Sequence, residues 1–221
     1  MSEGVLESRS LSIRGTVAGA AFTALTAVGA YISIPIGPVP IVLQNFFVIL
    51  AGLLLGPVRG LVSVTVYLLI GAVGLPVFAG GTGGIGHFFG PTGGYLVGFL
   101  PAVFLTGLIS HGALKLHGAG SSRATSSTSS GKRLDGGLSG PGSGSREPSV
   151  LRHVIAAAAG ALVVYMVGVP WLKAATGMAW GTSLGAGLIP FIPGDAVKVL
   201  AAAFTARSLA PRFASFLGGS E

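Results

Sequence analysis

The stretch that decides the fold is IVLQNFFVILAGLLLGPVRGLVSVTVYLLIGAVGL, Ile41 to Leu75, in which Arg59 is the one charged residue. We expect two apolar helices here, at 41–55 and 60–75, with Arg59 in the turn between them. Crossing a hydrocarbon core about 30 Å thick takes roughly 17 to 25 helical residues. Both helices are therefore short for a full crossing, so they either stop below the surface or are extended by loop backbone that protein shields from lipid.

The rest of the chain has the same apolar character. Of its 221 residues, 51% are hydrophobic and 9% are charged, whereas a soluble domain carries about 25% charged residues. Four more apolar stretches are candidate spans, at 13–34, 94–116, 150–169 and 195–212. These features predict an all-α integral membrane protein with six transmembrane helices in a single membrane domain, residues 1–221, whose solvent is the lipid bilayer.

The positions of the basic residues predict the orientation. Lysine and arginine favour cytoplasmic loops near the ends of spans. With six crossings and both termini in the cytoplasm, only Lys173 and Lys198 of the 13 lysines and arginines face outside. The apolar stretch 171–192 is an alternative seventh span, but that topology would move Arg207 and Arg212 outside. We therefore expect it to be a loop or a short helix over the outer face.

Residues 118–149 are rich in glycine and serine and predict a flexible cytoplasmic linker, because such a composition cannot bury enough apolar surface to fold. The net charge of +7 raises the question of nucleic acid, but the basic residues are scattered between apolar runs instead of gathered on one face of a soluble fold. We expect no nucleic-acid partner. The chain has no cysteine, which excludes thiol catalysis and cysteine metal sites.

The segment PGDAVK contains a pair of opposite charges, Asp195 and Lys198, beside an apolar run. Asp195 is the only acidic residue between Glu147 and Glu221. A charge at the bilayer centre costs about 2.5 to 3.5 kcal/mol, so such groups usually line a polar cavity. The alternative is that Asp195, after a proline and a glycine, caps the start of a helix. A cap needs no lysine three residues later on the same helix face, so we favour a polar ligand.

The uncharged loop PVFAGGTGGIGHFFGPTGGY, Pro76 to Tyr95, is the second candidate region. Glycine permits close approach of the backbone to a ligand, and aromatic side chains such as Phe78 and Tyr95 supply apolar walls. We expect a lid or pocket rim, with a plain connection between helices as the alternative. A G-x-G-x-x-G match at 81–86 has no β-strand before it, and no phosphate-binding G-x-x-x-x-G-K-[ST] is present, so the chain does not predict nucleotide hydrolysis.

Two further groups carry open alternatives. Gln44 and Asn45 lie just inside the second predicted span, where their amides either bind a ligand or join helices. In the first span, Ala20 and Ala24 form a pair of small residues four positions apart, which permits close helix approach. That approach is either packing within the domain or docking of a separate membrane protein.

Together, GPVPIVLQNFFVILAGLLLGPVRG, LPVFAGGTGGIGHFFGPTGGYLVGF and PFIPGDAVK resemble the BioY family in order and spacing. The resemblance implies a biotin transporter of a bacterial or archaeal cell membrane: a six-helix, substrate-binding S component of an energy-coupling factor transporter. It implies a separate transmembrane coupling protein and ATPase subunits as partners, with no enzymatic activity, cofactor or metal. The rival interpretation is a self-sufficient secondary transporter, in which Asp195 exchanges a proton.

The resemblance also assigns roles to residues. It places the aspartate and lysine of PGDAVK in the biotin site and makes the alanine-rich first helix the contact with the coupling protein, which fits Ala20 and Ala24. The remaining predicted site residues come from the GPTGGY element, from the apolar wall at Phe78 and from the amide of Gln44. The predicted substrate-binding residues are Asp195, Lys198, Tyr95, Gln44, Phe78, Thr92 and Gly93.

Overall fold

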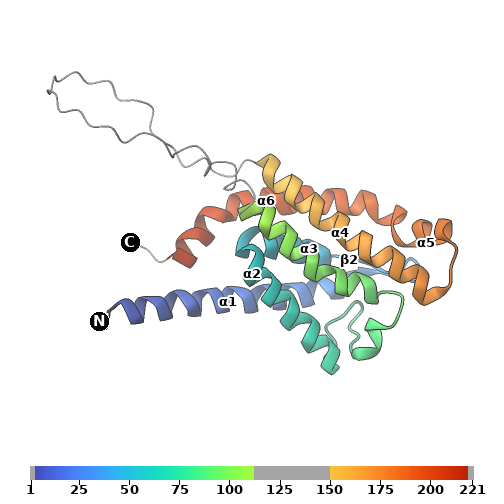
Figure 1. Cartoon of the computed structure of the whole chain (residues 1–221), viewed down its shortest axis with the longest axis horizontal. Helices are drawn as coiled ribbons and strands as arrows, with labels where there is room; N and C mark the ends of the chain where they lie inside the picture. Colours follow the sequence, from blue (N-terminus) through green and yellow to red (C-terminus); the bar gives the residue numbers. More distant parts are fainter. Residues whose placement is uncertain (1–2, 112–149, 219–221) are drawn as a thin grey trace, which may run out of the picture.

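The computed structural model describes residues 3–111 and 150–218, with side chains described from residue 13 onward. The linker predicted at 118–149 lies outside these described residues. In Figure 1, the start of the first helix and the end of the last lie at one end of the molecule, and α5 lies at the other. The helices are α1 (Glu3–Tyr31), α2 (Gln44–Val73), α3 (Gly93–His111), α4 (Val150–Thr176), α5 (Trp180–Gly187) and α6 (Ile192–Gly218).

Large apolar side chains cover the outside of the bundle. Val62 and Leu69 on α2 are 57% and 59% exposed, and Leu162 and Met166 on α4 are 60% and 66% exposed. Such a surface suits lipid, and it belongs to helices long and apolar enough to cross a membrane. In the described part of the chain there are five of these: Ile13–Tyr31, Gln44–Val73, Gly93–His111, Val150–Thr176 and Trp180–Leu217. The predicted all-α membrane fold is thus confirmed, while six crossings and cytoplasmic termini remain predictions.

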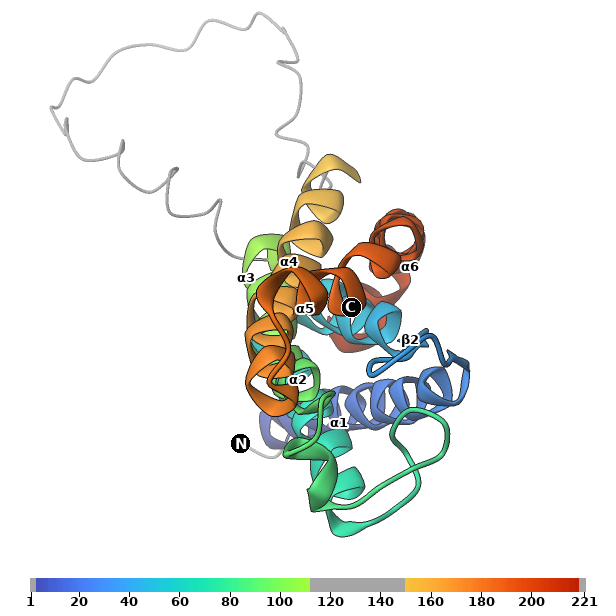
Figure 2. The same ribbon diagram turned by 90° about the vertical axis from the view of Figure 1, so that its right-hand side faces the viewer.

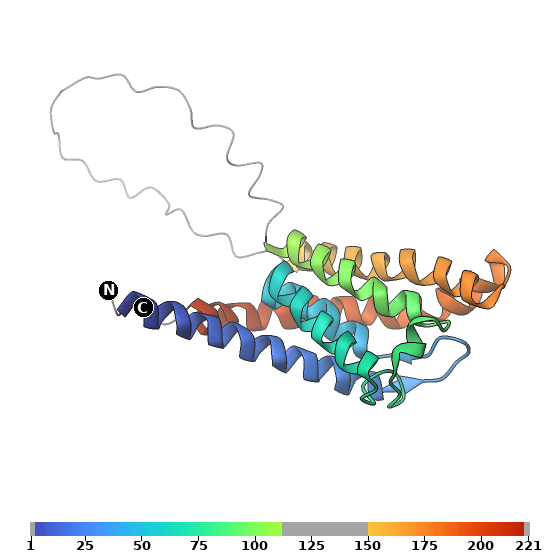
Figure 3. The same cartoon turned by 60° about the horizontal axis from the view of Figure 1, so that its bottom comes forward.

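The two helices predicted at 41–55 and 60–75 form the two limbs of α2, which bends sharply at Gly56 (Figure 3). Gly56 has φ 81° and ψ −178°, and Pro57 follows it. A Cβ atom built on Gly60 would lie 3.3 Å from the carbonyl oxygen of Ala51, although a straight helix separates residues nine apart by about 13 Å. The second limb therefore folds back on the first, as the turn around Arg59 predicted.

Replacing Gly56 with alanine should destabilise the protein by about 1 to 3 kcal/mol, because a side chain at positive φ is strained. The nearest side chain to the new Cβ, that of His111, would be 3.8 Å away, so the penalty tests conformation and not crowding. Gly185→Ala is the control, since Gly185 lies within α5 with nothing within 4 Å of its Cβ position. Stability is measured by thermal unfolding in detergent. An equal change in unfolding temperature in both variants would contradict this account of the bend.

Small residues let α2, α3 and α4 pack at close range. A Cβ on Gly52 of α2 would lie 2.7 Å from the carbonyl oxygen of Val103 of α3. A Cβ on Gly160 of α4 would lie 2.1 Å from Oγ1 of Thr106 of α3. Close backbone approach of this kind is how helices associate in lipid, where the hydrophobic effect between helices is weak. The view along the bundle in Figure 2 shows α3 and α4 side by side, and α6 packs against both α2 and α4.

The connecting segments gather at the end of the bundle that carries α5 (Figure 3). Strand β1 (Ser33–Ile34) pairs antiparallel with β2 (Ile41–Val42) to form a short hairpin. The loop between α2 and α3 contains the 3-10 helix η1 (Ile85–Phe88). The stretch 171–192, expected as a loop or short helix, holds the end of α4, the whole of α5 and η3 (Ile189–Phe191).

Candidate functional site

A cavity of about 240 Å³ lies at this end of the bundle, between the β1–β2 hairpin, the loop after α2 and the starts of α2 and α3. Its walls are mostly apolar, with a few polar groups placed among them, which is the usual composition of a small-molecule site. The polar groups include the amides of Gln44 and Asn45. The aromatic wall consists of Phe78, Tyr95, Phe99, Tyr165 and Phe191.

Three connecting segments at this end of the bundle contribute to the cavity. The hairpin segment supplies Val39, Pro40 and Val42, and the short segment before α6 supplies Phe191. The glycine-rich loop supplies Phe78, Ala79, Thr82, His87 and Thr92.

Gln44 presents an unpaired amide to this cavity. The residue is the first of α2 and is 1% exposed, and its Nε2 has no hydrogen-bond partner among the described residues. A buried N–H group without a partner costs about 1 to 3 kcal/mol, so native structures seldom leave one unexplained. An acceptor oxygen on a bound molecule would remove this cost. Of the two interpretations of the amide, ligand binding therefore fits better than a link between helices.

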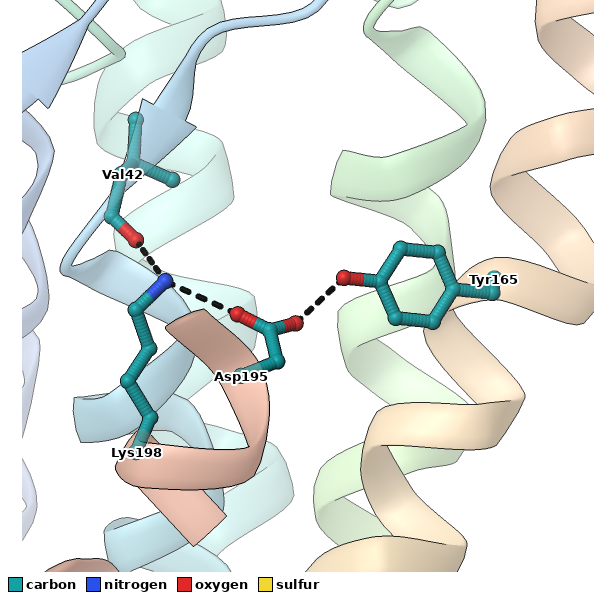
Figure 4. Close-up of polar contacts among 4 residues, drawn as sticks. All are labelled: Val42, Tyr165, Asp195 and Lys198. Carbon is teal, nitrogen blue, oxygen red and sulfur yellow. Dashed lines mark hydrogen bonds and ion pairs between the residues drawn. The ribbon is translucent and has the colours of Figure 1, made fainter. Parts of the chain in front are cut away.

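Asp195 and Lys198 form an ion pair next to the cavity (Figure 4). Lys198 Nζ lies 2.9 Å from Asp195 Oδ1 and donates to the backbone carbonyl oxygen of Val42 over 2.7 Å. The Tyr165 hydroxyl donates a short hydrogen bond to Asp195 Oδ2. Tyr165 and Val42 line the cavity, whereas the two charged residues do not. The ion pair is therefore connected to the cavity by its hydrogen-bond partners, Tyr165 on α4 and Val42 in the hairpin.

The helix-cap interpretation of Asp195 is wrong. Helix α6 begins at Ile192, three residues before Asp195, so Asp195 lies inside the first helical turn. Pro193 and Gly194, which suggested a break before the helix, are part of it, since proline is well tolerated in a first turn, where no intrahelical donor is needed. Asp195 is only 7% exposed, and both oxygens of its carboxylate bond side chains of this network. The helix dipole still favours its charge at this position.

The loop after α2 is anchored by Phe78. This side chain is 2% exposed, and its ring packs edge-on against Tyr67, His87 and Phe88 with centroid separations of 5.7 to 5.8 Å. The backbone N–H of Phe78 donates to the carbonyl of Thr82 over 2.8 Å, which closes a tight turn. Phe78 thus holds the rim in place and also forms part of the cavity wall.

The GPTGGY element places Thr92 and Tyr95 at the cavity but not Gly93. The Tyr95 hydroxyl donates to the carbonyl of Gly187 over 2.7 Å, which joins α3 to α5. Gly93 is buried, and a Cβ there would lie 2.0 Å from the carbonyl oxygen of Phe88 and 2.9 Å from Nε1 of Trp171. Packing alone therefore accounts for a glycine at position 93, since no side chain fits there.

Ala20 and Ala24 are exposed on α1, along the groove between α1 and the second limb of α2. Two hollows, of about 660 and 360 Å³, follow this groove, and Ala20 lines both. The neighbouring Gly19 serves packing instead, because its carbonyl oxygen accepts from Oγ of Ser63 over 2.8 Å. The alanine pair is therefore not used to pack the described part of the chain.

Reasoning from sequence missed Tyr165, which connects Asp195 to the cavity. It is the only tyrosine in the apolar run of α4, so a hydroxyl in need of a buried partner was the available signal. Phe191 and the carbonyl of Val42 carried no such signal. Their positions depend on how the hairpin and η3 fold over the bundle.

The fold and the cavity together define a class: a helical membrane protein with a small-molecule-sized site at one end of its bundle. The BioY family matches residues 6–215. The chain belongs to the BioY family, as its motifs predicted.

Related proteins agree with this assignment. The probable biotin transporter BioY of Pyrococcus horikoshii is 40% identical over 86% of this chain and 92% of its own length. The biotin transporter BioY of Rhodobacter capsulatus is 36% identical over 88% of this chain and 92% of its own length. A crystal structure of the S-component for biotin from an ECF-type ABC transporter superimposes with a TM-score of 0.70 at 30% identity, and covers 96% of this chain and 95% of that chain. These relatives are named as transporters or transporter components and not as enzymes.

Proposed function

We propose that this chain captures biotin in the 240 Å³ cavity and serves as the S component of an energy-coupling factor transporter in a prokaryotic plasma membrane. Membership of the BioY family and the similarity to a biotin S-component along nearly the whole chain support this function. A separate membrane coupling protein and ATPase subunits would supply the energy, because the sequence contains no phosphate-binding loop of its own. The chain itself performs no catalysis.

The observation that carries the proposal is the unpaired, buried amide of Gln44 in an aromatic-walled cavity. Biotin has a ureido group with one carbonyl acceptor and two N–H donors, an apolar bicycle and a carboxylate on an aliphatic chain. The five aromatic side chains suit the bicycle, and Gln44 Nε2 suits an oxygen of the ligand. A cavity somewhat below the roughly 300 to 1,000 Å³ of drug-sized ligands suits a compact vitamin.

Asp195 acts on the ligand through Tyr165. The family resemblance placed the carboxylate in the biotin site itself, but Tyr165 lines the cavity and Asp195 does not. Because the Tyr165 hydroxyl donates its proton to Asp195, its oxygen keeps lone pairs that can accept from the ligand. Lys198 holds the carboxylate in place and ties it to the hairpin. The site residues we propose are therefore Gln44, Phe78, Thr92, Tyr95 and Tyr165, supported by Asp195 and Lys198.

Replacing Gln44 with leucine should weaken biotin binding about tenfold, since one hydrogen bond to a buried group is lost. Isothermal titration of the detergent-purified protein with biotin and desthiobiotin measures the change. Thr65→Val, on the second limb of α2, is the control, because its hydroxyl bonds only its own helix at Leu61 and does not line the cavity. If the leucine variant bound biotin with wild-type affinity, Gln44 would serve helix packing and not ligand binding.

Transport by the purified chain in liposomes separates the two classes of transporter. We expect biotin uptake to require the coupling protein and ATP, and a proton gradient alone to drive none. The geometry of Asp195 supports this expectation, because both carboxylate oxygens are already bound by partners within the protein, the Tyr165 hydroxyl and Lys198 Nζ. Uptake driven by a proton gradient in the isolated chain would favour the secondary transporter instead.

A further inference from the structure

A second cavity, of about 450 Å³, lies at the opposite end of the bundle from the vitamin site. Four helices meet there: the bend of α2, the end of α3, the start of α4 and the second half of α6. His111 of α3 lines this cavity and Tyr95 of the same helix lines the first. Sixteen residues of helix place these positions about 24 Å apart, so the two cavities are separate sites.

The second cavity is strongly basic. Five of its lining residues carry cationic or titratable basic groups: Arg59, Arg152, Arg207, His111 and His153. Asp195 is the only carboxylate in residues 13–111 and 150–217, and it is paired with Lys198. No ion pair to these arginines is formed within the described residues.

Two buried polar atoms in this cluster have no partner among the described residues. His153 is 2% exposed, and its Nδ1 is unpaired. Nε of the adjacent Arg152 is also buried and unpaired. The positive-inside rule explains arginines near the ends of spans, but it does not explain a buried histidine with an unpaired nitrogen. Buried polar groups of this kind indicate a site that a bound molecule completes.

The remaining wall of the cavity is apolar. It consists of Leu53, Leu54, Leu55, Ala210, Pro211, Ala214 and Leu217. A free anion gains nothing from such a wall, whereas a lipid places its phosphate among the arginines and its glycerol and first methylene groups against the leucines. Basic pockets between transmembrane helices on the cytoplasmic side are suited to acidic head groups, and arginine forms forked hydrogen bonds with phosphate.

From this geometry we infer that the basic cavity binds the phosphate head group of an anionic phospholipid. Arg152 and Arg207 contact the phosphate oxygens, and His153 Nδ1 contributes a further hydrogen bond. The lipid fills the space between the start of α4 and the second half of α6 and so joins these two helices. This inference does not depend on which vitamin the other cavity holds.

The test adds phosphatidylglycerol, phosphatidylcholine or inorganic phosphate to the detergent-purified full chain. Native mass spectrometry then measures which of them stays bound, and thermal unfolding measures which of them stabilises the protein. The wild type should bind phosphatidylglycerol and be protected by it against thermal unfolding, with little effect of the other two. The double variant Arg152→Gln/Arg207→Gln should bind phosphatidylglycerol about 30-fold more weakly, at roughly fivefold for each arginine near a membrane surface. The lysine double variant, R152K/R207K, should keep most of the affinity, since it keeps both charges.

Arg212→Gln is the matched control, because Arg212 is exposed on the same helix as Arg207 and does not line the cavity. Biotin binding by every variant reports that the protein is folded. Equal binding of phosphatidylglycerol and phosphatidylcholine by the wild type, or an equal loss in the Arg212 variant, would overturn the site. If inorganic phosphate protected the protein as strongly as phosphatidylglycerol does, the lipid proposal would be rejected and the cavity would be a site for a free anion.

Discussion

Replacing Asp195 with alanine should weaken biotin binding roughly 100-fold or more and lower the unfolding temperature of the protein. The substitution leaves Lys198, whose side chain is 12% exposed, as a largely buried cation whose one remaining partner among the described residues is the carbonyl of Val42. It also leaves the Tyr165 hydroxyl without its acceptor. Removing one member of a buried pair typically costs about 3 to 5 kcal/mol of folding stability. The expected loss of affinity corresponds to about 2.8 kcal/mol of binding free energy, since each 1.4 kcal/mol is a factor of about ten.

A double variant separates binding from folding. Asp195→Leu combined with Lys198→Met removes both charges, and apolar replacement of a whole buried pair is often neutral for stability. We therefore expect the double variant to regain much of the thermal stability without regaining biotin affinity. Tyr165→Phe should show a smaller loss of affinity with little loss of stability. Near wild-type biotin binding in the double variant would show that the pair serves folding alone.

The sequence predicted the membrane fold because its signal is local. Long apolar runs and the scarcity of charge need no knowledge of tertiary contacts. The bend of α2 was predicted only in part. The short apolar runs on either side of Arg59 predicted a turn between two helices. The structure makes that turn at Gly56, whose non-helical φ and ψ separate the two helical limbs of α2.

The site was predicted less completely, because its chemistry depends on contacts between distant segments. The unusual charges of Asp195 and Lys198 pointed to the end of the bundle that holds the cavity of about 240 Å³, but neither residue lines that cavity. Tyr165 is 30 residues before its partner Asp195, and Val42 is 156 residues before Lys198. No spacing rule connects positions so far apart. The sequence also assigned Asp195 a capping alternative that the start of α6 at Ile192 excludes.

Replacing Ala20 and Ala24 together with leucine should reduce ATP-driven biotin uptake at least tenfold while leaving biotin binding unchanged. Both alanines are exposed along the groove between α1 and the second limb of α2. Their small size lets a helix of another protein approach closely, and association in lipid depends on such close packing. Two leucine side chains would fill the groove and keep the coupling protein away. The cavity proposed for biotin, at the end of the bundle that carries α5, is lined by neither residue.

Uptake is measured in liposomes that contain the chain, its coupling protein and the ATPases, with binding measured on the same preparations by titration. Ala21→Leu is the matched control, because Ala21 is exposed on the same helix but lines neither hollow of the groove. It presents the same added volume about 100° around the helix, on a face that meets lipid. Equal losses of uptake in the Ala21 variant would mean that bulk on α1 disturbs insertion in general. Unchanged uptake in the double variant would place the coupling surface elsewhere on the bundle.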